Sequence, residues 1–327
     1  MEKQRRVFEI IRSRVGVYQL ADTLADVLGI STDAVYRRMR CEKELTFSEL
    51  CKLCERFDLS MDDMLLTNNE KGSSNVVLFY NMAKYFNPLL YIEHLRTLLN
   101  EMKRIRAAEK KEMIVTVHDF PFYHYSGFYD LLCFKLYMIY DLGGVGFMSY
   151  EDFCSRLDKN EIMGLLKEIR NAYNDIPSKE IWTNRIGDPL IAYISHHYKL
   201  AGARYKAMSL LMLNQVKEVV KQVETDVGAG RKDHGTKAPF ELYVCPYPVG
   251  NTISVNVDGK KSSITSLTAI NDEVFSYKNS FCTDLEHWVR SLLSRSKLIS
   301  ATNSECHYYF LSIYEKINEV IHQIENS

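Results

Sequence analysis

A glycine and a serine separate two short amphipathic patterns near the start of the chain. The apolar residues of the first pattern recur at helical spacing, at Leu20, Leu24, Val27 and Leu28. Gly29 follows directly, and Ser31 is a favourable N-cap for a second helix that runs to about Arg40. The stretch therefore predicts a helix, a tight turn at residues 29–31 and a second helix.

Further short helices flank this pair. Val7, Ile10, Ile11 and Val15 mark a helix before it. Thr46 and Glu49 form a capping-box pattern that opens a helix after it, and Ser60 with Asp63 opens another. Residues 1–66 are thus predicted to form an all-α domain of five short helices.

The polar segment 67–75, rich in Gly, Ser and Asn, is typical of a linker. Residues 76–327 combine helical patterns with strand-like runs between 240 and 278, where Asp258-Gly259 is a hairpin-type pair. A short β-branched run at 113–120 can join the same sheet. The helical patterns lie after Pro88 and at about 126–141, 158–173, 187–200, 204–225, 281–296 and 304–325. We therefore expect a second domain that is α+β, mostly helical, with a small antiparallel sheet.

The charge of the whole chain is balanced, but the charge of its first domain is polarised. Lys and Arg number 41 and Asp and Glu number 42 in 327 residues, so a nucleic-acid function has to rest on local charge. Residues 1–15 carry net +3 and residues 31–43 net +2, whereas residues 44–66 carry net −4. One side of the first domain is therefore expected to be basic.

A helix, a tight turn and a second helix form the layout of a helix-turn-helix, whose second helix enters the major groove of DNA. Val35 and Met39 are expected to pack inward. Thr32, Asp33, Tyr36, Arg37 and Arg40 are then expected to point outward, with Arg38 at the flank. Thr32, Tyr36 and Arg37 suit contacts to bases or phosphates. We expect phosphate contacts from Arg38, Arg40, Lys43, Arg5 and Arg6.

The stretch LADTLADVLGISTDAVYRRMRCEKELTFSELCKLCERFDLSMDDML resembles the lambda-repressor-like helix-turn-helix domain of bacterial and phage regulators. The likeness covers residues 1–66. It implies a transcriptional regulator with double-stranded DNA as partner and a recognition helix that begins at Ser31. Many members of that family have a Gly just after this helix, where this chain has Cys41. The remainder resembles the large C-terminal region of other helix-turn-helix proteins.

Two other interpretations of the first domain are compatible with the sequence. Three arginines in one short helix can be an ordinary solvated face. A small helical module can also dock on protein, which would make the chain an interaction adaptor. The agreement of spacing, turn, caps and charge favours DNA binding over both.

A candidate effector pocket lies where the 113–120 strand passes into the following helix. Its residues are His118, Asp119, His124, Tyr125 and Phe128. The alternative is a Pro-rich turn whose polar groups are satisfied locally. The helix from Phe128 to Tyr140 is almost entirely apolar or aromatic, so it is either core or the wall of a cavity.

The sequence contains no assembled catalytic group. It has no H-E-x-x-H, no phosphate-binding loop and no nucleophile elbow. Cys51 and Cys54 fit a core pair in a helix better than a zinc site. We expect no enzyme activity, no metal and no cofactor. Eight scattered cysteines, a charged N-terminus and no long apolar run indicate a cytoplasmic protein.

The last helical pattern has heptad spacing over two repeats, at Phe310, Ile313, Ile317, Val320 and Ile324. It can be a dimer contact or the ordinary docking of a terminal helix. A homodimer is expected because one small helix-turn-helix contacts only a half-site.

Overall fold

The computed structural model describes residues 2–15, 20–57, 59, 79–82, 88–142, 148–232, 235–266, 272–276, 279–299 and 303–327. The chain forms two compact units, residues 1–77 and 78–327. Each unit has its own apolar core.

Four helices build the described part of the first unit. They are α1 Glu2–Val15, α2 Leu20–Leu28, α3 Thr32–Met39 and α4 Phe47–Phe57. Their apolar faces meet in one core that includes Ile11, Leu24, Val35 and Leu53. The first four predicted helices are confirmed. The fifth helix, predicted from Ser60, and the linker at 67–75 lie outside the described residues.

Local signals in the sequence set the helix ends of this unit. Gly29 has φ +68°, and its amide and that of Ile30 both donate to the Ala25 carbonyl, at 2.8 and 3.1 Å. The Ser31 hydroxyl accepts from the Ala34 amide at 3.3 Å and caps α3. Thr46 and Glu49 cap α4 reciprocally, with bonds of 3.0 and 3.2 Å. The turn and both caps predicted from the sequence are confirmed.

An eight-stranded sheet forms the centre of the second unit, in the order β1-β7-β6-β5-β2-β3-β4-β8. The strands are β1 Phe79–Met82, β2 Lys111–Thr116, β3 Ser178–Thr183, β4 Phe240–Cys245, β5 Thr252–Val257, β6 Lys260–Ser266, β7 Asp272–Ser276 and β8 Lys297–Leu298. Strands β2, β3 and β4 run parallel, and the remaining pairs are antiparallel.

The α+β class is confirmed, but the sheet is larger and mixed where a small antiparallel one was expected. The sheet is mixed because β3 lies between β2 and β4 and parallel to both, and it is larger because β1 and β8 extend its two edges. Its sequence SKEIWT carries a glutamate in the middle, so it lacks the apolar run of a buried strand. The Asp258-Gly259 hairpin between β5 and β6 is confirmed, with φ values of +50° and +84°.

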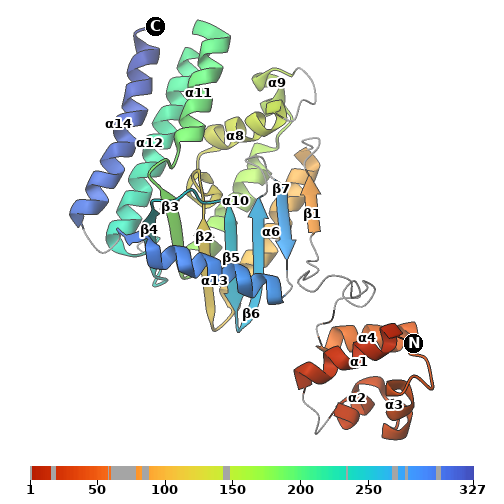
Figure 1. Ribbon diagram of the computed structural model, residues 1–327. Helices are drawn as coiled ribbons and strands as arrows, with labels where there is room; N and C mark the ends of the chain where they lie inside the picture. The colour runs from red at the N-terminus through yellow and green to blue at the C-terminus, as the bar shows by residue number, and fades with distance from the viewer. Residues whose placement is uncertain are drawn as a thin grey trace. The chain divides into compact units, whose positions relative to one another are not determined.

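Helices cover both faces of the sheet. They are α6 Pro88–Ala107, α7 Phe122–Tyr125, α8 Tyr129–Leu142, α9 Tyr150–Ser155, α10 Lys159–Asn174, α11 Asp188–Ala201, α12 Lys206–Ala229, α13 Asn279–Arg295 and α14 Asn303–Glu325. Met113 and Val115 of β2 point into the larger core, whereas Ile114 between them packs with Val289 of α13. Figure 1 shows α13 crossing one face of the sheet.

The apolar stripe of α14 packs inside its own chain. Phe310, Ile313, Ile317 and Ile324 are at most 2% exposed. Three hydrogen bonds join α14 to the neighbouring α12, among them Lys217 to Asn318 at 2.9 Å and Tyr314 to Glu224 at 3.0 Å. The interpretation of this stripe as a dimer contact was therefore wrong, because α12 and the core already cover it.

Candidate functional site

Helix α3 presents one polar face to solvent and one apolar face to the core. Val35 is fully buried and Met39 packs against the same core. Thr32 and Asp33 are exposed. Tyr36 is 51% exposed, and the Arg37 side chain is 55% exposed. The four residues expected to face outward from the first two turns of this helix therefore do so.

Arg38 differs from the expectation that it contacts phosphate. Its side chain is 4% exposed and forms a two-bond ion pair with Glu49, with Nη2 to Oε1 at 2.6 Å and Nε to Oε2 at 3.1 Å. Its Nη1 donates to the Ala34 carbonyl at 3.1 Å. The guanidinium thus joins α3 to the start of α4. It sets the orientation of the exposed face and is not part of it.

The end of α3 carries further exposed cations. Arg40 is 60% exposed, and its Nε lies 3.0 Å from Oε1 of Glu42. The other carboxylate oxygen of Glu42 lies 3.9 Å from Nε of Arg37. Exposed pairs of this kind contribute little free energy, so either arginine can exchange Glu42 for another anion. Lys43 and Arg5 are also exposed. The side chain of Arg6 lies outside the described residues.

Gln4 connects α1 to the loop after α3. Its amide nitrogen donates to the carbonyls of Arg38 and Lys43, at 2.7 and 2.8 Å. Its amide oxygen accepts from the Leu45 amide at 3.0 Å. A single glutamine gives no signal in a sequence, so sequence reasoning missed this contact. It holds the N-terminal part of α1, with Arg5, beside the end of α3.

Cys41 ends α3 in a left-handed conformation, with φ +61°. Its amide donates to the Arg38 carbonyl at 3.0 Å, and the Glu42 amide donates to the Arg37 carbonyl at 2.8 Å. This is the Schellman pattern, whose left-handed position is usually glycine. Cys41 therefore forms the same turn as the glycine that many related domains have at this position.

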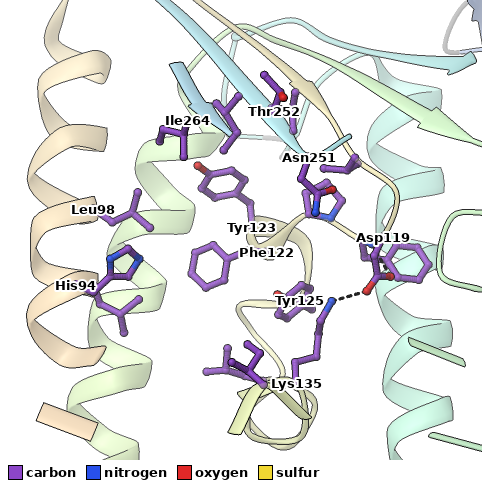
Figure 2. Close-up of a pocket in the computed structure, with 18 of the residues that line it drawn as sticks. His94, Leu98, Asp119, Phe122, Tyr123, Tyr125, Lys135, Asn251, Thr252 and Ile264 are labelled. Carbon is purple, nitrogen blue, oxygen red and sulfur yellow. Dashed lines mark hydrogen bonds and ion pairs between the residues drawn. The ribbon is translucent and has the colours of Figure 1, made fainter. Parts of the chain in front are cut away.

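The second unit contains a cavity of about 570 Å³ among α6, α7, α8, β5 and β6 (Figure 2). Aliphatic and aromatic side chains form most of its wall, among them Leu98, Phe122, Leu136 and Ile264. Figure 2 shows Leu98 and His94 on α6, and Thr252 and Ile264 on the strands. Three residues of the candidate effector pocket, His118, Asp119 and Tyr125, line this cavity.

A paired charge lies at one end of the cavity. Lys135 Nζ is 2.7 Å from a carboxylate oxygen of Asp119 and 4.6 Å from the centre of the Tyr125 ring. Both charged side chains are less than 15% exposed. Burial lowers the pKa of Lys135, but Asp119 and Tyr125 outweigh burial and raise it. The lysine therefore stays charged and its charge is cancelled by Asp119.

His124 and Phe128 do not line this cavity, so the expected pocket was wrong for these two residues. His124 is 6% exposed and its Nε2 lies 2.8 Å from Glu180, which is fully buried in β3. The Glu180 carboxylate also accepts from Trp182 at 2.7 Å and from the Tyr173 hydroxyl. Phe128 lies in a more open hollow between α10 and α12.

The buried glutamate keeps its negative charge through these partners. Burial raises the pKa of Glu180, but His124, Tyr173 and Lys232 together outweigh it and lower the pKa. Lys232 is 2% exposed and donates to the carbonyls of Tyr173 and Ile176 and to the Ser178 hydroxyl, at 2.6 to 2.8 Å. This polar cluster stabilises the core between β3, α7 and α10. None of these residues lines the cavity or the hollow at Phe128, so the cluster supports the fold and does not form a binding site.

Within the described residues, no group of three or more His, Cys, Asp or Glu side chains is placed to hold a metal ion. Cys51 and Cys54 are both partly buried on α4, and Cys54 packs against the first core. Among the helices that the structure describes, none is long and apolar enough to cross a membrane.

The comparison with protein families agrees with the exposed face of α3. Residues 5–112 match the BetR domain, a helix-turn-helix-type domain of DNA-binding regulators. The matched segment is about a third of the chain and extends through α6 into β2. No curated protein and no solved structure matches the chain. The family describes a regulatory DNA-binding role and not an enzymatic one.

Proposed function

We propose that the chain is a sequence-specific transcriptional regulator whose first unit binds DNA in the manner of lambda-repressor-like domains. The observation that carries this proposal is the geometry of α3. Thr32, Tyr36 and Arg37 share its exposed face, and its opposite face is held by the core and by Arg38. A helix held on one side and polar on the other is suited to the major groove.

Each residue proposed to contact DNA has a role that fits its chemistry. Arg37 suits a two-bond contact to guanine, and Asp33 can accept from the amine of cytosine. Thr32 and Tyr36 suit thymine methyls or phosphates. Phosphate contacts come from Arg40, Lys43 and the N-terminal arginines Arg5 and Arg6. Arg38 orients α3 and does not touch DNA.

A gel-shift titration of the full chain tests the base-reading role. The chain is first used to select genomic fragments, and the best fragment is titrated with wild type and Arg37→Ala. We expect a loss of about 10-fold to 100-fold on that fragment, because one good arginine to guanine contact discriminates by about 1–3 kcal/mol. Arg56→Ala, an exposed arginine in the last turn of α4, is the matched control. Unchanged binding by Arg37→Ala would remove the base-reading role and favour an adaptor that docks on protein.

The second unit is proposed to dimerise the protein and to sense a signal. Two-fold pairing would bring two α3 helices to one operator and raise the affinity through effective concentration. The buried stripe of α14 is not the pairing surface. Sedimentation equilibrium of the full chain decides the dimer, and a monomer at micromolar concentration with and without DNA would refute it. The cavity beside His118 is the proposed site of the signal.

A further inference from the structure

We infer that the cavity of the second unit binds a neutral, mostly apolar small molecule that presents one carbonyl or amide oxygen to His118 and Asn251. The inference rests on the proposed sensing role and names the class of ligand. It is carried by the volume of the cavity, by its charge and by the donors left over in its wall.

The volume and the wall suit a small molecule. Binding cavities for small molecules commonly measure about 300–1,000 Å³ and are lined mainly by apolar and aromatic groups with a few polar ones. At about 570 Å³, this cavity lies within that range. Its apolar wall comes from α6, α7, α8, β5 and β6, so it surrounds a ligand on several sides.

The charges in the wall favour a neutral ligand over an anion. The Lys135 ammonium is already paired with Asp119 at 2.7 Å, and the same carboxyl group accepts from the Phe120 amide at 2.8 Å. The other carboxylate in the wall, Glu101, is paired with Arg104 at 2.8 Å on the surface of α6. No lysine or arginine in the described wall is left to neutralise a bound anion, and burying an unpaired charge is costly.

Two neighbouring residues of the wall, His118 and Asn251, have hydrogen-bond donors without a partner. The His118 amide donates to Oδ1 of Asn251 at 3.1 Å, which leaves the Asn251 amide nitrogen with two hydrogens to donate. Within the described residues, neither that nitrogen nor the His118 ring has a hydrogen-bond partner, and both residues line the cavity. A neutral imidazole can donate one further hydrogen. Neighbouring donors of this kind match a carbonyl oxygen, which has two lone pairs.

Dye titration of the full chain without DNA tests the inference. Nile red is neutral, apolar and carries a carbonyl oxygen, whereas anilinonaphthalene sulfonate is of similar size and anionic. We expect saturable binding of one Nile red per chain, at least about 10-fold tighter than binding of the sulfonate. A sulfonate dye that binds as tightly as Nile red, or Nile red that does not saturate, overturns the inference.

Two variants assign the binding to this cavity. His118→Phe removes the donor and should weaken Nile red by about 10-fold or more, whereas His287→Phe makes the same change on the exposed side of α13 and should have no effect. Leu98→Trp fills the cavity from α6 and should abolish binding. Each variant counts only if its melting temperature matches the wild type. Nile red binding that survives both changes overturns the inference.

The dye experiment and the gel shift fail independently. If the chain binds Nile red through His118 but selects no DNA, the ligand-site inference stands and the proposed DNA-binding function is refuted. If DNA binding depends on Arg37 but the chain binds no Nile red, the proposed DNA-binding function stands and the inferred ligand class is refuted. Arg37→Ala should leave Nile red binding unchanged, because Arg37 lies in the first unit.

Discussion

Arg38 of α3 and Glu49 of α4 form a nearly buried ion pair with two hydrogen bonds, at 2.6 and 3.1 Å. Glu49 also caps α4 by accepting from the Thr46 amide at 3.0 Å. Burial raises the pKa of Glu49, but the hydrogen bonds from Arg38 and Thr46 outweigh it and lower the pKa. One carboxylate therefore serves as a helix cap and as the anchor of the proposed recognition helix.

Arg38→Met should destabilise the first unit by about 3 kcal/mol, because removing one partner of a buried pair leaves the other uncompensated. Native-state hydrogen exchange of the α3 and α4 amides measures this change. Arg56→Met, at an exposed position of α4, should change the opening free energy little. An unaltered exchange rate in Arg38→Met would show that the pair does not hold α3.

Cys41→Gly should stabilise the first unit by about 1 kcal/mol. Cys41 is held at φ +61°, a conformation that costs an L-residue about 1–2 kcal/mol and glycine almost nothing. The hydrogen bonds of the turn use only backbone atoms, so glycine preserves them. Cys51→Gly inside α4 is the control and should destabilise by about the same amount. Hydrogen exchange of the α3 and α4 amides measures both variants. A loss of stability in Cys41→Gly would show that the Cys41 backbone is not strained.

Arg40→Ala and Lys43→Ala should each weaken binding to all DNA sequences alike and flatten the dependence on salt. Each phosphate contact that is lost should reduce the slope of log K against log salt by about 0.9. This slope is measured by titrating selected and random fragments at salt concentrations from about 50 to about 200 mM, where the affinity for DNA depends strongly on salt. A variant that changes sequence specificity and leaves the slope unchanged would show that the residue contacts bases and not phosphate.

We expect the stability of the protein to depend on pH through Lys232. Burial lowers the pKa of Lys232 to about 7, despite the opposing effect of Glu180, Asp226 and Asp175. Above pH 7 the unfolded chain, with an ordinary lysine pKa, binds more protons than the folded chain does. The free energy of unfolding should therefore rise between pH 7 and pH 9 through this group.

Urea unfolding of the full chain at the two pH values, followed by the tyrosine and tryptophan signal, measures the rise. Lys232→Met should show a smaller rise, and Lys237→Met, an exposed neighbour, should behave as the wild type. An identical rise in Lys232→Met would assign the pH dependence to other groups.

Signals that act over a few residues were predictable from the sequence. The Ser31 cap, the Thr46 to Glu49 capping box and the turns at Gly29 and Asp258-Gly259 depend on neighbours three or four positions away. The longer helices of both units follow from the spacing of their apolar residues, whereas the short helices α7 and α9 were not predicted. The exposed face of α3 follows from the same spacing, because Val35 and Met39 define its buried side.

Contacts between distant residues were not predictable. Arg38 is a charged residue at the edge of an amphipathic helix, and only Glu49, eleven positions later, makes its burial favourable. His124 was expected in a pocket, but Glu180, fifty-six positions later, draws it into the core. β3 was missed for the same reason, since its central glutamate is tolerated only with partners from α7 and α10.

Sequence patterns alone were enough to predict the caps of α3 and α4, the turns, the α+β class and the outward side of α3. These features depend on backbone conformation and on one periodic pattern at a time. Only the three-dimensional fold shows which charges are buried, that the apolar stripe of α14 packs inside its own chain, and that His118 and Asn251 meet at one cavity. Desolvation explains the division. A buried charge or an apolar stripe is stable only beside its partner, and the partner is chosen by the fold.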